Sequence, residues 1–151
     1  MDRTEKEEYI IGVVSLLANK LSQIGDGFLP DITFKQWFLL IIISKMEKDE
    51  KNINDIAELS GTTRQNIKKM LALLEKKEYV VVSKSQKDSR ALKVQLTEKA
   101  YLYFENNRTL AAKEADNLFK IFANEEIDLL ASKLQKLFQS LENYERKDKD
   151  E

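Results

Sequence analysis

Basic side chains that could contact a polyanion are concentrated in one part of this 151-residue chain. Residues 62–93 carry 9 basic and 3 acidic side chains, a net charge of +6, although the formal net charge of the whole chain is −1. The flanking segments are acidic, with net charges of −4 over residues 1–61 and −3 over residues 94–151. A positive patch attracts polyanions whatever the overall charge of the molecule.

The first turns of a predicted helix over residues 62–77 combine the side-chain types that bind DNA. Arginine, glutamine and asparagine can form paired hydrogen bonds with purine edges in the major groove. Lysine, threonine and the N–H groups at a helix start suit phosphate oxygens. Thr62 and Gln65 are expected to form a capping box at its start. The candidate DNA-binding residues of this helix are Thr62, Thr63, Arg64, Gln65, Asn66, Lys68 and Lys69.

A polar loop between two short strand-like segments follows this helix. Residues 79–82 are rich in β-branched side chains, and residues 92–96 alternate between apolar and polar, so a hairpin is predicted with residues 83–91 as its protruding part. A basic side chain on a thin loop can enter the minor groove, whose potential is strongly negative. The candidates here are Lys84, Ser85, Lys87, Asp88, Ser89 and Arg90.

Helices on the N-terminal side of this region must support it. Residues 5–24 place apolar side chains at helical spacing, and Gly25-Asp26-Gly27 is expected to end that helix. Thr33 and Gln36 predict a capping box that opens a second, largely apolar helix. A short third helix, capped by Asn52, and a Ser-Gly turn then precede the basic helix.

The order of helix, glycine-containing turn, helix and hairpin predicts a winged helix-turn-helix. Thr97 is expected to cap a long helix, and Asn124 to interrupt it and cap the last one. The predicted fold class is therefore mainly α with a small β-hairpin wing. A DNA-binding lobe would span residues 33–97, and the helices in 5–24 and 98–147 would form a helical dimerisation region.

Composition excludes several kinds of site. The chain has no His and no Cys, which argues against histidine bases, thiol chemistry and ordinary zinc sites, so no metal or cofactor is predicted. Glu125 and Glu126 could act as acid and base, but carboxylates are favoured at a helix start anyway, so an enzyme is not expected. The longest apolar run has seven residues, 37–43, and the N-terminus is highly charged, so a cytoplasmic protein is expected.

The chain also resembles the MarR-type transcriptional regulators. The resemblance runs from residues 52–61 through the end of the basic helix at 74–77, and continues in Asp88-Ser89-Arg90 and in Val94-Gln95-Leu96-Thr97. It implies a dimeric winged-helix protein that binds DNA. It further implies that Arg90 contacts the minor groove and that Asp88 holds the wing in place by pairing with basic groups.

The chain departs from the family pattern at two positions. Many members have glycine where Glu78 stands, and the residue at this helix-to-strand turn would take a left-handed conformation that costs glutamate more than glycine. Many members also have glycine where Ala100 stands, which matters little because alanine is a good helix former. Neither departure touches the proposed DNA contacts.

The sequence is compatible with two functions. We favour a sequence-specific double-stranded DNA-binding transcriptional regulator, a dimeric repressor reading a pseudo-palindromic operator, with helix 62–77 in the major groove and the 83–91 wing in the minor groove. The alternative is a winged-helix protein-interaction module whose basic patch binds an acidic partner. The residues alone leave a monomeric core and a homodimer equally open, and the resemblance favours the homodimer.

A small-molecule effector of unknown identity is a further possibility that the residues do not decide. Aromatic side chains are expected near the junction of the DNA-binding lobe and the dimerisation helices, where a lipophilic ligand could lie. Ordinary core packing is the favoured explanation of these residues. They are Trp37, Phe38, Tyr103 and Phe104.

Overall fold

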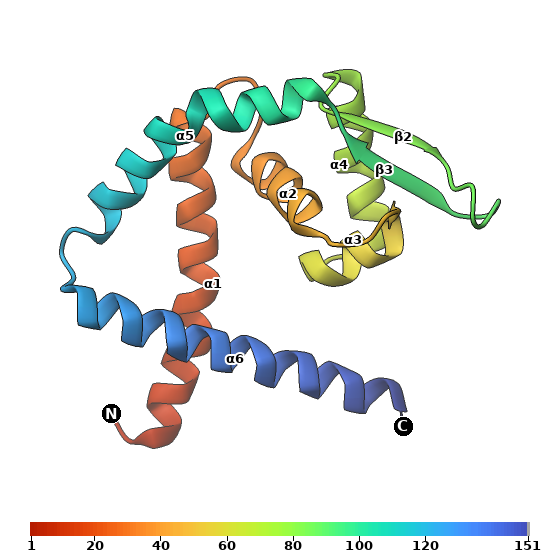
Figure 1. The fold of residues 1–151 in the computed structure, drawn as a ribbon. Helices are drawn as coiled ribbons and strands as arrows, with labels where there is room; N and C mark the ends of the chain where they lie inside the picture. The colour runs from red at the N-terminus through yellow and green to blue at the C-terminus, as the bar shows by residue number, and fades with distance from the viewer. Residues whose placement is uncertain (151) are drawn as a thin grey trace. The chain divides into compact units, whose positions relative to one another are not determined.

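The computed structural model describes the backbone of residues 1–150 and the side chains of residues 1–145. The chain forms two compact units, Met1–Asn107 and Arg108–Glu151. No helix in the described part of the chain is both long and apolar enough to cross a membrane. The elements, in order (Figure 1), are α1 (Arg3–Phe28), α2 (Phe34–Lys45), β1 (Lys51–Asn52), α3 (Ile53–Ser60), α4 (Arg64–Lys76), β2 (Val80–Lys84), β3 (Leu92–Leu96), α5 (Glu98–Phe119) and α6 (Asn124–Asp150).

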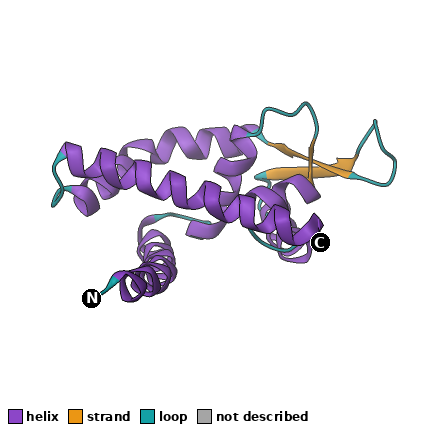
Figure 2. Cartoon of the chain, turned by 90° about the horizontal axis from the view of Figure 1, so that it is seen from below, coloured by secondary structure: helices purple, strands orange, loops and turns teal. Residues whose placement is uncertain are grey.

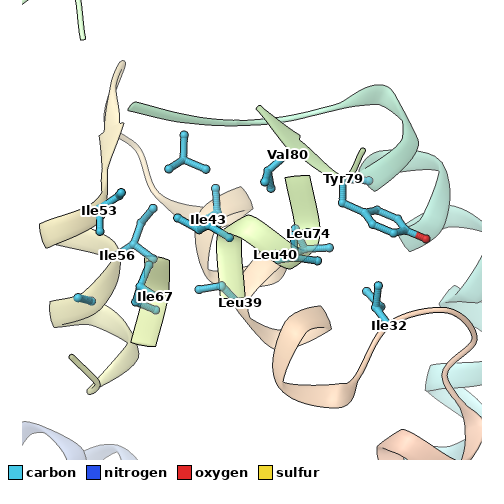
Figure 3. Close-up of a cluster of buried hydrophobic side chains, with 14 of the residues drawn as sticks. Ile32, Leu39, Leu40, Ile43, Ile53, Ile56, Ile67, Leu74, Tyr79 and Val80 are labelled. Carbon is cyan, nitrogen blue, oxygen red and sulfur yellow. The ribbon is translucent and has the colours of Figure 1, made fainter. Parts of the chain in front are cut away.

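One hydrophobic core holds the first unit together. Apolar side chains from α2, α3, α4 and the two hairpin strands meet in it (Figure 3). Each fully buried aliphatic side chain contributes roughly 1.5–3 kcal/mol relative to exposure, so this cluster fixes α4 against its neighbours. The largest fully buried side chains are Leu40, Ile43, Ile56, Ile67, Leu71, Leu74, Val80 and Val94.

The start of α2 confirms the predicted capping box. Thr33 Oγ1 accepts a hydrogen bond of 3.2 Å from the backbone N–H of Gln36, and the Gln36 side chain accepts one of 3.1 Å from the backbone N–H of Thr33. These two bonds satisfy donors that the first helical turn leaves without partners. The apolar run that follows is helical, as predicted.

The first helix is longer than predicted, because Gly25 and Gly27 lie inside α1. Gly25 is buried, and a Cβ there would overlap the ring of Phe34. The Asp26 carboxylate also accepts a hydrogen bond of 2.7 Å from the backbone N–H of Phe34. Gly25 therefore allows α1 and α2 to approach closely, and it does not end the helix.

The helix-turn-helix connection differs from the prediction by one residue. Gly61 has a left-handed conformation (φ 62°), and the N–H of Thr62 is bonded to the carbonyl of Ala57. Thr62 is thereby held in the turn, so α4 begins one residue later and Thr63 caps it by accepting from the N–H of Asn66. The expected capping box of Thr62 and Gln65 was wrong.

The small sheet has three antiparallel strands in the order β1-β3-β2. The β3 strand has the predicted bounds, whereas β2 extends to Lys84, which pairs with Leu92. The loop of the wing therefore starts at Ser85 rather than Ser83. Figure 2 shows β2 and β3 ending in this loop. The two-residue strand β1 was not predicted, because so short a segment carries no alternation.

Glu78 has the left-handed conformation that the family pattern implied for this position, with φ 64°. Its carbonyl accepts a hydrogen bond of 2.7 Å from the Thr97 hydroxyl, which holds the turn to the start of α5. The chain therefore makes the helix-to-strand turn without glycine, at the cost of local backbone strain.

The second unit contains the end of α5 and the whole of α6. Helix α6 starts at Asn124, so the capping position is Ala123 rather than the predicted Asn124. The backbone N–H of Ala123 donates to the Glu126 carboxylate at 2.8 Å, which satisfies a donor that an alanine side chain cannot. The division of the chain into a DNA-binding lobe and a dimerisation region stays a prediction.

Candidate nucleic-acid interface

Helix α4 divides into a buried face and a charged, exposed face. Ile67, Leu71 and Leu74 are each at most 1% exposed, and their spacing of three and four residues puts them on one side of the helix. This side of the helix is an apolar stripe that packs into the core. The side chains of Arg64, Gln65, Lys68 and Lys69 are all exposed, so the helix presents three cations and one amide to its surroundings.

The other candidate residues of this helix are engaged within the protein. Thr63 caps α4, and the Asn66 side-chain amide donates to the Thr62 hydroxyl at 3.1 Å. Thr62 is half-buried, whereas Thr63 and Asn66 are exposed. These three residues therefore shape the start of α4, whereas the side chains of Arg64, Lys68 and Lys69 are exposed and form no ion pair among the described side chains.

The tip of the wing is built from local hydrogen bonds. The Ser85 N–H donates to the Ala91 carbonyl at 2.9 Å, and the Ala91 N–H donates to the Asp88 carbonyl at 3.0 Å. The Asp88 carboxylate accepts a 2.9 Å bond from the backbone N–H of Arg90. The Arg90 side chain is exposed. Asp88 thus shapes the turn that carries Arg90.

The remaining wing candidates differ in their surroundings. Lys84, Lys87 and Ser89 are exposed, and Ser85 is half-buried. Lys87 lies 3.7 Å from the carboxylate of Asp49, in a pair so exposed that it adds little stability. Within the part of the chain whose side chains are described, Asp88 has no ion pair with a basic side chain, so its role differs from the pairing that the resemblance implied.

Glu50 is a residue that the sequence reasoning missed. Its carboxylate accepts hydrogen bonds from the hydroxyl of Ser85 and, at 3.3 Å, from the backbone N–H of Gln86. The Ser85 hydroxyl, and then the Gln86 N–H, lower the pKa of the Glu50 carboxyl below its ordinary value. Glu50 and Ser85 are 35 positions apart in the sequence, which explains why no local pattern indicated the contact.

A mostly apolar cleft of about 530 Å³ lies between α1, α2 and the first turns of α4. Phe38 lines it, together with residues such as Leu21, Met70 and Asn66. Ser60 is also a lining residue, and its buried hydroxyl is the one side-chain polar atom of this kind without a hydrogen-bond partner in the described part of the chain. The wall of the cleft is therefore mostly apolar, and Thr62 and Asn66 at the start of α4 are among its polar residues.

Three of the four aromatic residues proposed for an effector site do not line this cleft. Tyr103 belongs to the core, where its hydroxyl donates to the carbonyl of Pro30 at 2.8 Å. Burial raises the pKa of Tyr103 to about 12. Trp37 and Phe104 are half-buried and pack against the same core. Core packing explains these three residues, because they cover the apolar interior that α2 and α5 share.

The comparisons with known proteins agree with this architecture. Residues 31–91 match the sequence profile of the MarR family. The HTH-type transcriptional regulator YfiV of Bacillus subtilis (strain 168) is 26% identical over 139 residues, which cover 92% of this chain and 86% of YfiV. Both YfiV and the matched family are transcriptional regulators, the class of protein that the sequence analysis favours.

Solved structures show the same fold. The S. aureus MepR–DNA complex has a TM-score of 0.74 at 22% identity, covering 85% of this chain and 95% of MepR. A MarR/EmrR family transcriptional regulator from Acinetobacter sp. ADP1 has a TM-score of 0.77 at 21% identity, covering 91% of this chain and 97% of that protein. These likenesses show that the chain has the winged helix-turn-helix fold, and residues 31–91, which hold its helix-turn-helix and most of its wing, match the MarR family of transcriptional regulators.

Proposed function

We propose that this protein regulates transcription by binding double-stranded DNA sequence-specifically, with α4 in the major groove and the wing in the minor groove. The observation that carries the proposal is the exposed face of α4 with Arg64, Lys68 and Lys69, followed in the same unit by an exposed wing arginine, Arg90. MepR, which shares the fold, was solved bound to DNA, which supports the same class of ligand here. A cytoplasmic location is part of this proposal, because its ligand is the cell's DNA.

The protein would act as a homodimer and as a repressor that occupies a pseudo-palindromic operator. A single winged helix reads few base pairs, whereas a two-fold dimer reads two half-sites about 34–36 Å apart. Long helices outside the winged-helix core support this, because their apolar side chains are exposed in a single chain, as at Ile11 (70%) and Phe138 (56%). A second copy of the chain is the occupant that we propose for these faces.

The direct test of DNA binding starts with selection of bound sequences from a random duplex pool. Fluorescence anisotropy on the selected duplex then compares the wild type with Lys69→Ala and Arg90→Ala. Each variant should bind more weakly, because each loses one cation from the proposed contact surface. Affinity should also fall with salt by about 0.9 log unit per log unit of salt for each phosphate contacted.

Lys113→Ala is the matched control, since Lys113 is an exposed lysine of α5 outside the winged helix. It removes the same charge and should leave operator affinity unchanged. Equal losses in all three variants would indicate non-specific attraction and overturn the proposed geometry. No binding of random duplex DNA at low salt would instead favour the protein-interaction alternative.

The dimer is tested by sedimentation. Leu137→Asp places a charge in the apolar face of α6, and we expect it to halve the molecular mass and weaken operator binding. Gln139→Asp, two residues away on the same helix, should do neither. A wild-type protein that sediments as a monomer at micromolar concentration would contradict the dimer.

The cleft beside α4 is where we propose that a small-molecule effector would bind. It adjoins Thr62 and Asn66 at the start of α4, so an occupant would touch the element proposed to read DNA. A screen of small amphipathic compounds by thermal shift, repeated with Phe38→Ala, tests this site. Stabilisation that persists unchanged in the variant would place the ligand elsewhere.

A further inference from the structure

The wing is joined to the loop before β1 by both oxygens of one carboxylate. Glu50 Oε2 accepts from the hydroxyl of Ser85, and Glu50 Oε1 accepts from the backbone N–H of Gln86. The two partners stand at the point where β2 ends and the wing loop starts. The carboxylate therefore holds the base of the loop rather than its far end.

Ser85 passes this contact on to the tip. While its hydroxyl donates to Glu50, its oxygen accepts from the backbone N–H groups of Lys87 at 3.1 Å and Asp88 at 3.2 Å. A hydroxyl has one proton and two lone pairs, so an acceptor for the proton leaves both lone pairs for the tip amides. Asp88 then binds the N–H of Arg90, which completes a chain of bonds from Glu50 to the wing arginine.

The loop that carries Glu50 is itself anchored to the helix-turn-helix. The next two residues, Lys51 and Asn52, pair with β3, and the Asn52 side chain caps α3 by accepting from the N–H of Asp55 at 2.8 Å. Helix α3 packs against α4. One end of the chain of bonds is thus fixed to the helices, and the other end carries the exposed side chain of Arg90.

We propose that Glu50 is a positioning residue for DNA binding, whose carboxylate acts through Ser85 to hold the wing and Arg90 in a fixed placement relative to α4. The inference rests on the proposed DNA-binding function. The proposal predicts that removing the charge of Glu50 weakens DNA binding, which is the opposite of what electrostatic repulsion alone predicts. An anion next to a DNA-binding wing repels phosphates, so its removal would strengthen binding if charge were its whole contribution.

Glu50→Gln and Asp49→Asn form a matched pair for this test. Each variant removes one negative charge from the same loop, but Asp49 has a 92% exposed side chain whose one ion pair among the described side chains is with Lys87, at 3.7 Å. Asp49→Asn should bind the operator as tightly as the wild type or more tightly. Glu50→Gln should bind about two- to tenfold more weakly, the range that corresponds to loss of one hydrogen bond. Equal tightening in both variants would overturn the proposal.

Epistasis with Arg90 separates positioning from a general loss of stability. If Glu50 acts by placing Arg90, then in an Arg90→Ala background the further change Glu50→Gln should no longer weaken binding. A loss of the same size in both backgrounds would contradict the proposed route.

Amide hydrogen exchange of the protein tests the contact between Glu50 and the base of the wing loop in the absence of DNA. Exchange at Gln86, Lys87 and Asp88 should be faster in Glu50→Gln and in Ser85→Ala, and unchanged in Asp49→Asn. Unchanged exchange in Glu50→Gln, or faster exchange with undiminished operator affinity, would refute the inference. If the wild type itself fails to bind DNA, the proposed function fails, while the exchange result still reports on the contact.

Discussion

The hydroxyl of Tyr79 donates a hydrogen bond of 2.6 Å to Oδ2 of Asp31, 48 residues earlier in the chain. The ammonium group of Lys77 lies 3.5 Å from Oδ1 of the same carboxylate and also donates to the Asp31 carbonyl. These contacts join the connection between α1 and α2 to the segment that ends α4. The position of the proposed DNA-reading helix therefore depends on a carboxylate outside the helix-turn-helix.

Tyr79→Phe should lower the free energy of unfolding by about 1.5–3 kcal/mol, the range for a hydrogen bond to a charged group. We expect the lower end, because the Asp31 side chain is 48% exposed and water replaces the phenol. Urea unfolding followed by circular dichroism measures the change. Tyr101→Phe is the control, since Tyr101 is 55% exposed, and a loss of the same size there would contradict the assignment.

Stability should fall with acid partly through Asp31. The hydrogen bond from Tyr79, and then the charge of Lys77, hold the pKa of Asp31 below its ordinary value of 3.8. A carboxyl with a lowered folded-state pKa stabilises the fold above its unfolded pKa and loses that contribution as the pH falls through the folded value. Asp31→Asn should therefore be less stable than the wild type at neutral pH, and the difference should shrink below about pH 4.

Urea midpoints at a series of pH values, in buffers of equal ionic strength, measure this difference. Asp116→Asn is the control, because Asp116 is an exposed carboxylate of α5, and its difference from the wild type should not change with pH. A difference between Asp31→Asn and the wild type that is constant with pH would show that the carboxylate charge is not involved.

Glu78→Gly should stabilise the protein by about 1 kcal/mol, because glycine adopts the left-handed conformation without the steric cost that a Cβ brings. The hydrogen bond from the Thr97 hydroxyl would be kept, because its acceptor is the backbone carbonyl of residue 78. The shift of the urea midpoint measures the gain. Glu105→Gly is the control, because residue 105 lies in the helical interior of α5, where glycine should destabilise the protein by a similar amount. If both variants were less stable than the wild type, the left-handed conformation of Glu78 would carry no steric cost.

Gly25→Ala should destabilise the protein by about 1–3 kcal/mol, because the new methyl group would meet the Phe34 ring and the approach of α1 to α2 would have to widen. Gly27→Ala, two residues later in the same helix, meets nothing within 4 Å and should be neutral or slightly stabilising. Thermal unfolding of the two variants side by side gives the comparison. Equal effects would mean that the contact with Phe34 is not tight in solution.

The sequence by itself determined the order of the elements and the class of the fold. The apolar spacing of α4, the cap at Thr33 and the alternation of β3 each depend on residues within about four positions of one another, so they can be read from the chain directly. The basic stretch depends only on composition. The left-handed conformation at position 78 was implied by the family resemblance and not by the local pattern.

Only the tertiary structure decided the contacts between distant segments. Gly25 lies against Phe34, Glu50 holds Ser85, and Tyr103 lies in the core rather than in a cleft. Each outcome depends on which surfaces meet when the core closes, and that is set by the packing of whole helices and strands rather than by neighbouring residues. The same reason explains why Thr62, a good cap by type, is held in the turn by the carbonyl of Ala57 and leaves the cap to Thr63.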